Sequence, residues 1–229
     1  MSQPVYILCL ETATTMCSVC ITANDKVLAY KEINGGYSHA ENLHVFIQDV
    51  LKEANLSVKQ ISAVAVSKGP GSYTGLRIGV SSAKGLCFAL QIPLISIDTL
   101  QSMAYAVAQS RQEDILYCPM LDARRMEVYC AVYNNQLENV IPVHALVLDE
   151  KSVEVFNLDK PICFFGDGMP KAKALLQTKR HSVFTEDVFP SSQSMASLAY
   201  KKFSEQTFED LAYFEPFYLK EFYTTAKKQ

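Results

Sequence analysis

A glycine-rich segment, Gly69-Pro-Gly-Ser-Tyr-Thr-Gly75, has the composition of a loop that could hold an anion. It lies between an apolar, β-rich run at 61–66 and a helix-like segment at 76–90, and backbone N–H groups of such a loop can converge above the end of a sheet. However, the loop contains no lysine, and the chain has no G-x-x-x-x-G-K-[ST] motif. The sequence therefore favours a rigid packing turn, with Ser72 or Thr74 capping the next helix, over a nucleotide cradle.

Histidines and cysteines could bind a metal ion, but their spacing in this chain is unsuitable. His39 and His44 are five residues apart, so on a helix their rings would point roughly 140° apart. Cys17 and Cys20 form a lone C-x-x-C in a strand-like run, where residues three apart point to opposite faces. We therefore expect no metal site in this chain.

Two polar segments follow apolar strands and could line a cleft. Glu11 and Thr12 lie where a phosphate-binding hairpin would place a carboxylate, although Ala13 occupies a position where such a hairpin favours glycine. Asp122 and Arg124 follow another strand, where the two halves of the chain should meet. Arg124 could face the cleft and contact a nucleotide or a partner, or it could pair with Asp122 and stabilise the strand end. The sequence leaves both interpretations open.

The elements that must position these residues form two similar series. The first half reads as three strands, a helix, a strand, the glycine loop with its helix, a strand and a helix. The second half repeats this order, with a weak or missing first helix at 151–158. Such a duplication is typical of the α/β class with actin/sugar-kinase-like (ribonuclease H-like) domains. We predict two domains, 1–110 and 111–229, each with a mixed five-stranded sheet and helices.

The composition agrees with a soluble globular protein, since 49% of the 229 residues are hydrophobic and 20% are charged. The formal net charge is -3, and no run of Lys or Arg exceeds two residues, so a dominant nucleic-acid-binding surface is not expected. No stretch is apolar for long enough to span a membrane, and no signal peptide is evident. These features predict a cytoplasmic protein.

The helix after the glycine loop carries two stripes of apolar or small residues. One stripe contains Leu76, Val80, Ala83, Cys87 and Leu90, and the adjoining one contains Gly75, Gly79, Ser82, Leu86 and Ala89. A helix that lies on its own sheet needs only one apolar stripe. The second stripe would allow another backbone to approach closely. That backbone could belong to the same domain or to a partner, and the two possibilities remain open.

Residues 69–79, GPGSYTGLRIG, followed by Ala83-Lys-Gly85, resemble the signature of the TsaB (YeaZ) family, G-P-G-S-[FY]-T-G-L-R-I-G followed by A-K-G-L. Three further blocks are similar to that family: residues 7–12, residues 121–129 and residues 216–220. Together, the blocks extend the resemblance over essentially the whole chain. Glu11 replaces the usual Asp and Lys220 the usual Arg, so both departures keep the sign of the charge.

The resemblance implies a non-catalytic subunit in tRNA threonylcarbamoyladenosine synthesis. In this family TsaB pairs with its paralogue TsaD, which performs the transfer, and the ATPase TsaE docks on the pair. The contact uses the helices expected here at 38–54 and 76–90, and the same surface makes a homodimer of the isolated protein. ATP or ADP and metal then belong to the partners, and tRNA is contacted only indirectly. The implied partner-binding residues are Leu43, Ile47, Gly75, Gly79, Ser82, Ala83 and Leu86.

Two alternatives from other functional classes are less consistent with the residues. A glycopeptidase-type metalloprotease would need a metal triad and a base, yet the chain has neither H-x-x-x-H nor H-E-x-x-H. A free-standing ATP-dependent kinase of the same fold would need tight binding of Mg-ATP by the chain alone.

Overall fold

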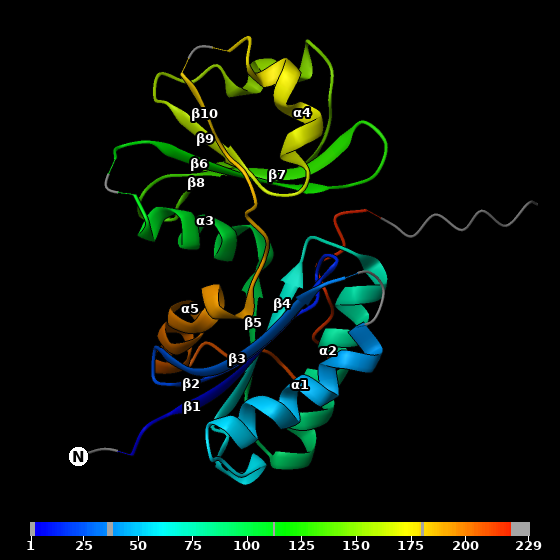
Figure 1. Cartoon of the computed structure of the whole chain (residues 1–229), viewed down its shortest axis with the longest axis vertical. Helices are drawn as coiled ribbons and strands as arrows, with labels where there is room; N and C mark the ends of the chain where they lie inside the picture. Colours follow the sequence, from blue (N-terminus) through cyan, green and yellow to red (C-terminus); the bar gives the residue numbers. More distant parts are fainter. Residues whose placement is uncertain (1–2, 36–38, 112, 180, 221–229) are drawn as a thin grey trace, which may run out of the picture.

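The protein consists of two lobes, each built on one five-stranded sheet (Figure 1). The structure is a computed structural model and describes residues 3–35, 39–111, 113–179 and 181–220. The strand order is β3-β2-β1-β4-β5 in the first sheet and β10-β9-β6-β7-β8 in the second. Each sheet combines antiparallel and parallel pairs, as the duplicated α/β fold requires. The predicted fold class is confirmed.

The first sheet contains an antiparallel unit of three strands extended by two parallel strands: β1 (Tyr6–Glu11), β2 (Met16–Ala23), β3 (Lys26–Asn34), β4 (Ala63–Gly69) and β5 (Leu94–Asp98). Alternate residues of these strands face opposite sides of the sheet. Helices α1 (His39–Glu53) and α2 (Tyr73–Leu90) cover one face, and α5 (Ser192–Ser204) covers the other. A short 3₁₀ turn, η1 (Val58–Gln60), precedes β4.

The second sheet repeats this plan with β6 (Leu116–Asp122), β7 (Glu127–Tyr133), β8 (Asn139–Val147), β9 (Ile162–Phe165) and β10 (Ser182–Thr185). Helix α4 (Met169–Leu176) and the 3₁₀ turn η2 (Ser152–Phe156) cover one face. Helix α3 (Thr99–Gln109) covers the other face, and the lobes meet where α3 lies beside α5 (Figure 1).

The two halves of the chain exchange one helix each. α3 follows the first sheet in sequence but packs on β6 of the second sheet, whereas α5 follows the second sheet but packs on β1. The predicted ranges 1–110 and 111–229 therefore each contain one sheet, but they do not divide the helices as the packing does.

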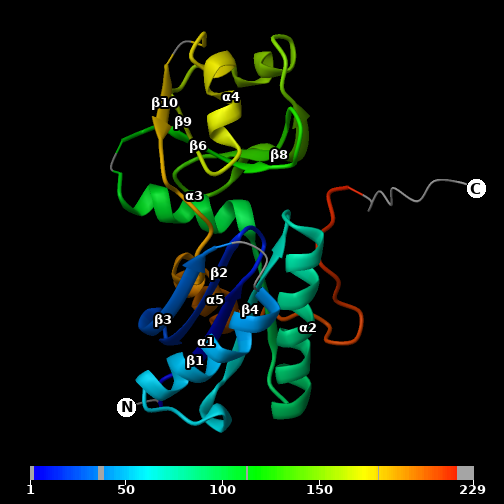
Figure 2. The same ribbon diagram turned by 45° about the vertical axis from the view of Figure 1, so that its right-hand side comes forward.

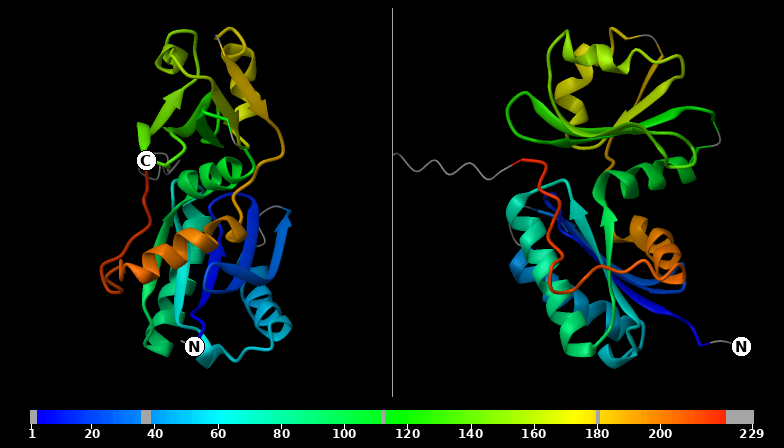
Figure 3. Two further views of the ribbon diagram at one scale, coloured as in Figure 1. Left: turned by 90° about the vertical axis from the view of Figure 1, so that its left-hand side faces the viewer. Right: turned by 180° about the vertical axis from the view of Figure 1, so that it is seen from behind.

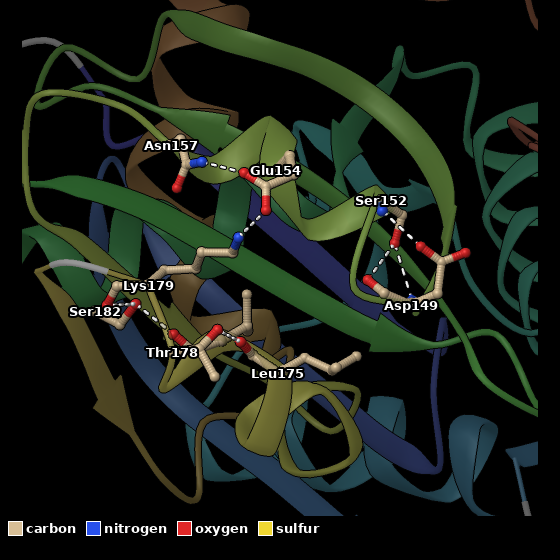
Figure 4. Close-up of polar contacts among 9 residues, drawn as sticks. Asp149, Ser152, Glu154, Asn157, Leu175, Thr178, Lys179 and Ser182 are labelled. Atoms are coloured by element: carbon tan, nitrogen blue, oxygen red, sulfur yellow. Dashed lines mark hydrogen bonds and ion pairs between the residues drawn. The ribbon is translucent and has the colours of Figure 1, made fainter.

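The segment at 151–158, predicted to hold a weak or missing helix, forms only the single turn η2. Polar contacts tie this turn to the end of α4 (Figure 4): Glu154 pairs with Lys179, while Ser152 and Asp149 bond each other across the start of the turn. Ser182 donates to the carbonyl of Leu176 at 2.9 Å.

Most other elements agree with the sequence prediction, with shifts at their ends. α2 begins three residues earlier than predicted, at Tyr73, and its N-cap is Ser72, whose hydroxyl accepts from the N–H of Gly75 at 3.3 Å. β8 covers Asn139–Val147, whereas the apolar pattern of the sequence indicates a strand only from residue 145. The sequence Ser-His-Ala-Glu at 38–41 fits a capping box at the start of α1, but Ser38 lies outside the described ranges. Within those ranges, no helix combines the length and the apolar character needed to cross a bilayer.

Residues 207–220 form a segment that we call the C-terminal strap. It leaves α5, bridges the edge of β5 at Leu94 and continues along the first lobe beside α2 (Figure 3). Lys84 of α2 donates to the carbonyl of Phe214 at 3.0 Å, and the N–H of Phe217 donates to the carbonyl of Lys68 at 2.7 Å. This aromatic segment therefore packs back on the first lobe, and its last described residues lie at the junction of the lobes.

Candidate functional site

The glycines of the loop and of α2 make room for the hairpin between β1 and β2. An ideal Cβ on Gly71 would lie 2.3 Å from the carbonyl oxygen of Ala13, and one on Gly75 would lie 2.1 Å from the carbonyl oxygen of Thr12. Real Cβ atoms do not approach other atoms so closely, so only glycine fits at these positions. Gly71 and Gly75 therefore allow the loop to pack closely on the hairpin, while residues 71–74 also line the cleft described below.

Glu11 and Thr12 are fully buried behind this hairpin and do not line a cleft. Oε1 of Glu11 accepts from the N–H of Ala13 at 2.6 Å and from the hydroxyl of Ser67 at 2.9 Å. Burial raises the pKa of the Glu11 carboxyl to about 7, although these hydrogen bonds act in the opposite direction. Thr12 donates to the carbonyl of Gly75 at 2.8 Å. Both side chains thus hold the hairpin against β4 and α2, and their prediction as cleft residues is corrected.

The predicted partner-binding residues lie mostly inside the first lobe. Leu43, Ile47 and Ala83 belong to its core, and Gly75 and Gly79 are buried against the hairpin. Ser82 and Leu86 are half-buried. The prediction that this stripe is an exposed seam is therefore corrected at Gly75 and Gly79, because the hairpin of the same chain covers them, whereas Ala89 at the far end of the stripe is exposed.

The face of α2 that adjoins this stripe, and shares Ala89 with it, is open to solvent. We call it the outer face of α2; it consists of Ser81, Gly85, Phe88 and Ala89. The Phe88 side chain is 71% exposed, and an ideal Cβ on Gly85 would meet no atom within 4 Å. Helix α1 lies beside α2 (Figure 2) and exposes Val45. A large exposed aromatic residue beside small residues is typical of a surface that another protein covers.

A cleft of about 740 Å³ lies between the lobes. The first lobe contributes the hairpin and the start of α2, the second contributes the turn between β6 and β7, and the strap contributes its last described residues. Lining residues include Thr14, Ser72, Tyr73, Thr74, Asp122, Arg124, Arg125, Glu127, Tyr129, Asp167, Tyr218 and Lys220. The predicted cleft residues Asp122 and Arg124 are therefore in the cleft.

Asp122 does not form the ion pair with Arg124 that one interpretation predicted. Its Oδ1 accepts from the backbone N–H of Arg124 at 2.7 Å and binds Nζ of Lys171 at 2.5 Å. The backbone N–H of Asp122 in turn donates to Asp167 at 2.9 Å, and burial raises the pKa of the Asp167 carboxyl. Lys171 and Asp167 follow Asp122 by more than 40 residues, so no local sequence pattern links either of them to Asp122.

The histidines occupy separate environments. His39 is buried, and its Nε2 donates to the carbonyl of Thr14 at 2.7 Å, whereas His44 is exposed on α1. Within the described ranges, no group of three His, Cys, Asp or Glu side chains is arranged to hold a metal ion.

Comparison with known proteins relates most of the chain to TsaB proteins and to the TsaD family model. A sequence model of the TsaD family, tRNA N6-adenosine threonylcarbamoyltransferase, matches residues 33–228. The TsaB protein of Bacillus subtilis, named as a tRNA threonylcarbamoyladenosine biosynthesis protein, is 30% identical over 174 residues, which is 75% of each chain. The chain belongs to the TsaB family. The TsaB of Buchnera aphidicola from Baizongia pistaciae is 28% identical over 94% of this chain and 98% of its own length.

Structural similarity agrees with this assignment to the TsaB family. YeaZ from Pseudomonas aeruginosa superposes with a TM-score of 0.81 at 24% identity, covering 94% of this chain and all of that structure. An activator of 2-hydroxyisocaproyl-CoA dehydratase from Clostridium difficile, solved with bound ADPNP, has a TM-score of 0.53 at 10% identity, covering 91% of this chain and 99% of its own. These similarities show the fold. Membership of the TsaB family connects the chain with tRNA threonylcarbamoyladenosine biosynthesis.

Proposed function

We propose that the chain is a non-catalytic subunit that binds a TsaD-type threonylcarbamoyltransferase and supports its reaction on tRNA. The observation that carries this proposal is that the outer face of α2 exposes Phe88 beside Gly85. In addition, the chain belongs to the TsaB family and matches the TsaD family model. Over 68 residues, the chain is 38% identical to the tRNA N6-adenosine threonylcarbamoyltransferase of Anoxybacillus flavithermus. Two related subunits can pair through corresponding helices, as in a pseudo-symmetric dimer.

The docking surface that we propose differs from the one predicted from the sequence. Gly75, Gly79 and Ala83 face the chain's own hairpin and core, so a partner would contact Ser81, Gly85, Phe88 and Ala89. Phe88 is the proposed anchor, because exposed aromatic side chains contribute strongly when a partner buries them. Gly85 and Ser81 allow the partner's backbone to approach α2 closely.

Mixing the purified chain with TsaD of the same organism tests the proposal. We expect Phe88→Ser and Gly85→Trp each to weaken the complex at least tenfold in Kd, because the first removes the anchor and the second blocks close approach. The matched control is Val147→Ser, since Val147 is 57% exposed but lies on β8 of the other lobe. Wild-type affinity in both α2 variants would show that the surface is wrong, and no complex with the wild-type chain would refute the pairing itself.

The remaining partners and the absence of activity are part of the same proposal. We propose that TsaE docks on the pair, that the isolated chain forms a homodimer through the outer face of α2, and that tRNA contacts the chain only indirectly. ATP or ADP and metal are assigned to the partners. Sedimentation of the isolated chain and of Phe88→Ser tests the homodimer. ATP hydrolysis by the isolated chain, abolished by a substitution in its own cleft, would refute the non-catalytic role.

A further inference from the structure

The second lobe contains a buried thiol in contact with a histidine. Cys130 of β7 and His144 of β8 lie directly opposite each other in the antiparallel pair, and 3.7 Å separates Sγ of Cys130 from Nε2 of His144. Cys130 is fully buried, whereas His144 is half-buried on β8, the edge strand of the sheet. The register of the two strands shifts directly after this pair, an irregularity that is common beside functional sites. The imidazole ring thus links the buried sulfur to the surface of the lobe.

The contacts of the imidazole ring determine what it can exchange with Cys130. Nδ1 of His144 lies 2.8 Å from the carbonyl oxygen of Pro142, which can only accept a hydrogen bond, so Nδ1 carries a proton. Nε2 then either accepts from the thiol of Cys130 or, once it has taken that proton, donates to the thiolate. In the second arrangement, both N–H groups of the imidazolium have an acceptor. The ring is therefore positioned to take the proton of the thiol.

A second thiol stabilises the negative charge of a Cys130 thiolate. Cys118 of β6 lies two residues from Met120, the direct partner of Cys130, so it faces the same side of the sheet as a diagonal neighbour of Cys130. Hydrogen bonds from Cys118 and from His144 lower the pKa of the Cys130 thiol to about 6, although burial acts in the opposite direction. The hydrogen bond with Cys130 raises the pKa of His144 to about 9.

The other elements packed around this pair contribute apolar side chains to the same core. These are Val153 and Phe156 of η2, Phe164 of β9 and Met169 of α4. They shield the thiolate and the imidazolium from water and so strengthen their attraction.

Cys87 of the first lobe is buried in a different environment. Its Sγ donates to the carbonyl of Pro93 at 3.4 Å, and burial raises the pKa of its thiol to about 11. Burial alone thus keeps a thiol protonated and unreactive, and the contact with His144 distinguishes Cys130 from Cys87.

We propose that Cys130 is a reactive thiolate and the site at which peroxides oxidise this chain. The thiolate sulfur attacks one oxygen of hydrogen peroxide, so that an S–O bond forms and the O–O bond breaks. The sulfur is oxidised to a sulfenic acid and the peroxide is reduced. The oxygen that leaves as hydroxide takes the proton of the His144 imidazolium and becomes water. A small oxidant is required, because the sulfur is buried behind the ring of His144.

Treating the full chain with hydrogen peroxide, trapping sulfenic acid with dimedone and analysing each cysteine peptide by mass spectrometry tests this proposal. We expect Cys130 to be labelled at least about tenfold faster than Cys87, the internal control. His144→Gln should slow the labelling of Cys130 at least about tenfold, because the amide cannot take the proton. The matched control His44→Gln, on the exposed side of α1, should leave the rate unchanged. Equal labelling of Cys130 and Cys87 in the wild type, or an unchanged rate in folded His144→Gln, would overturn the proposal.

The pH dependence of labelling separates a preformed thiolate from an ordinary thiol. Between pH 7 and pH 8, the wild-type rate at Cys130 should stay constant within about twofold, whereas in His144→Gln it should rise several-fold as the thiol ionises. A wild-type rate that rises as steeply as that of Cys87 would contradict the proposal. Circular dichroism and thermal melting establish that each variant is folded. If His144→Gln does not fold, the wild-type comparison of Cys130 with Cys87 and the wild-type pH profile decide the question.

A denatured sample provides the last control. In urea, Cys130 and Cys87 should be labelled at similar rates, because the unfolded chain no longer holds His144 against Cys130. A preference for Cys130 that persists in urea would overturn the role of the fold. The outcome is independent of the TsaD-binding experiment, since Phe88 and Gly85 lie on α2 of the other lobe.

Discussion

Two faces of α2 contain the same small residue types but have opposite environments. On the inner face, Gly75 and Gly79 touch the hairpin of the same chain, so a Cβ at either position would collide with Thr12. On the outer face, Gly85 borders open space beside the exposed ring of Phe88. The difference shows that a stripe of small residues indicates close approach of a backbone but does not say whose backbone it is. Substitutions can separate the two cases.

The largest expected effect comes from Gly75→Ala. The added Cβ would lie 2.1 Å from the carbonyl oxygen of Thr12, and this carbonyl belongs to a buried hairpin that cannot move without disturbing Glu11 and Ser67. We expect a loss of about 3 kcal/mol in the free energy of unfolding, the upper end of the range for overpacked sites. Urea unfolding measures it. A loss below about 0.5 kcal/mol would mean that the hairpin is not rigid and that the inner face is not a packed interface.

A second test concerns the hairpin that fills the inner face. The pKa of Glu11 is about 7 in the folded protein against 4.5 as its ordinary value, so the folded state binds the proton more tightly. Protonation of Glu11 therefore contributes to the free energy of unfolding. This contribution is fully present below pH 4.5 and is lost as the pH rises through 7. The expected loss between pH 5 and pH 8 is about 2–3 kcal/mol.

Glu11→Gln should remove this part of the pH dependence, because the amide does not titrate. The measurement is the difference in unfolding free energy between wild type and variant at pH 5 and pH 8, in which the contributions of other titrating groups cancel. If this difference in unfolding free energy is the same at pH 5 and pH 8, Glu11 titrates with an ordinary pKa, and its carboxyl group is not shielded from water as the structure indicates.

The sequence was sufficient to predict the duplicated fold, because strand and helix periodicities and the glycine loop are local signals. It identified Asp122 and Arg124 as cleft residues from their place after a strand. It could not predict which face of α2 is open. That depends on the hairpin at residues 12–15, more than 50 residues away, and helical periodicity does not specify it.

Other features of the site depend on contacts equally distant in sequence. Lys171 forms an ion pair with the carboxylate of Asp122, although 49 residues separate these two residues. Arg124, only two residues from Asp122, forms no ion pair with it. The strap reaches the cleft from the opposite end of the chain and places Tyr218 against Tyr73. The sequence also did not predict that α3 and α5 each pack on the sheet of the other lobe. The apolar face of a helix shows that the helix is buried but not which sheet it covers.

The smallest expected effect has the opposite sign and makes the comparison sharpest. Gly85→Ala is the same substitution as Gly75→Ala in the same helix, but its Cβ would meet nothing within 4 Å. Alanine loses less backbone entropy than glycine on helix formation, so we expect a gain of roughly 0.5–1 kcal/mol in the free energy of unfolding. Destabilisation of the monomer would show that part of the chain covers Gly85. A gain in stability with an unchanged affinity for TsaD would instead fit an outer face where a single methyl group is tolerated and only a bulky side chain blocks the partner.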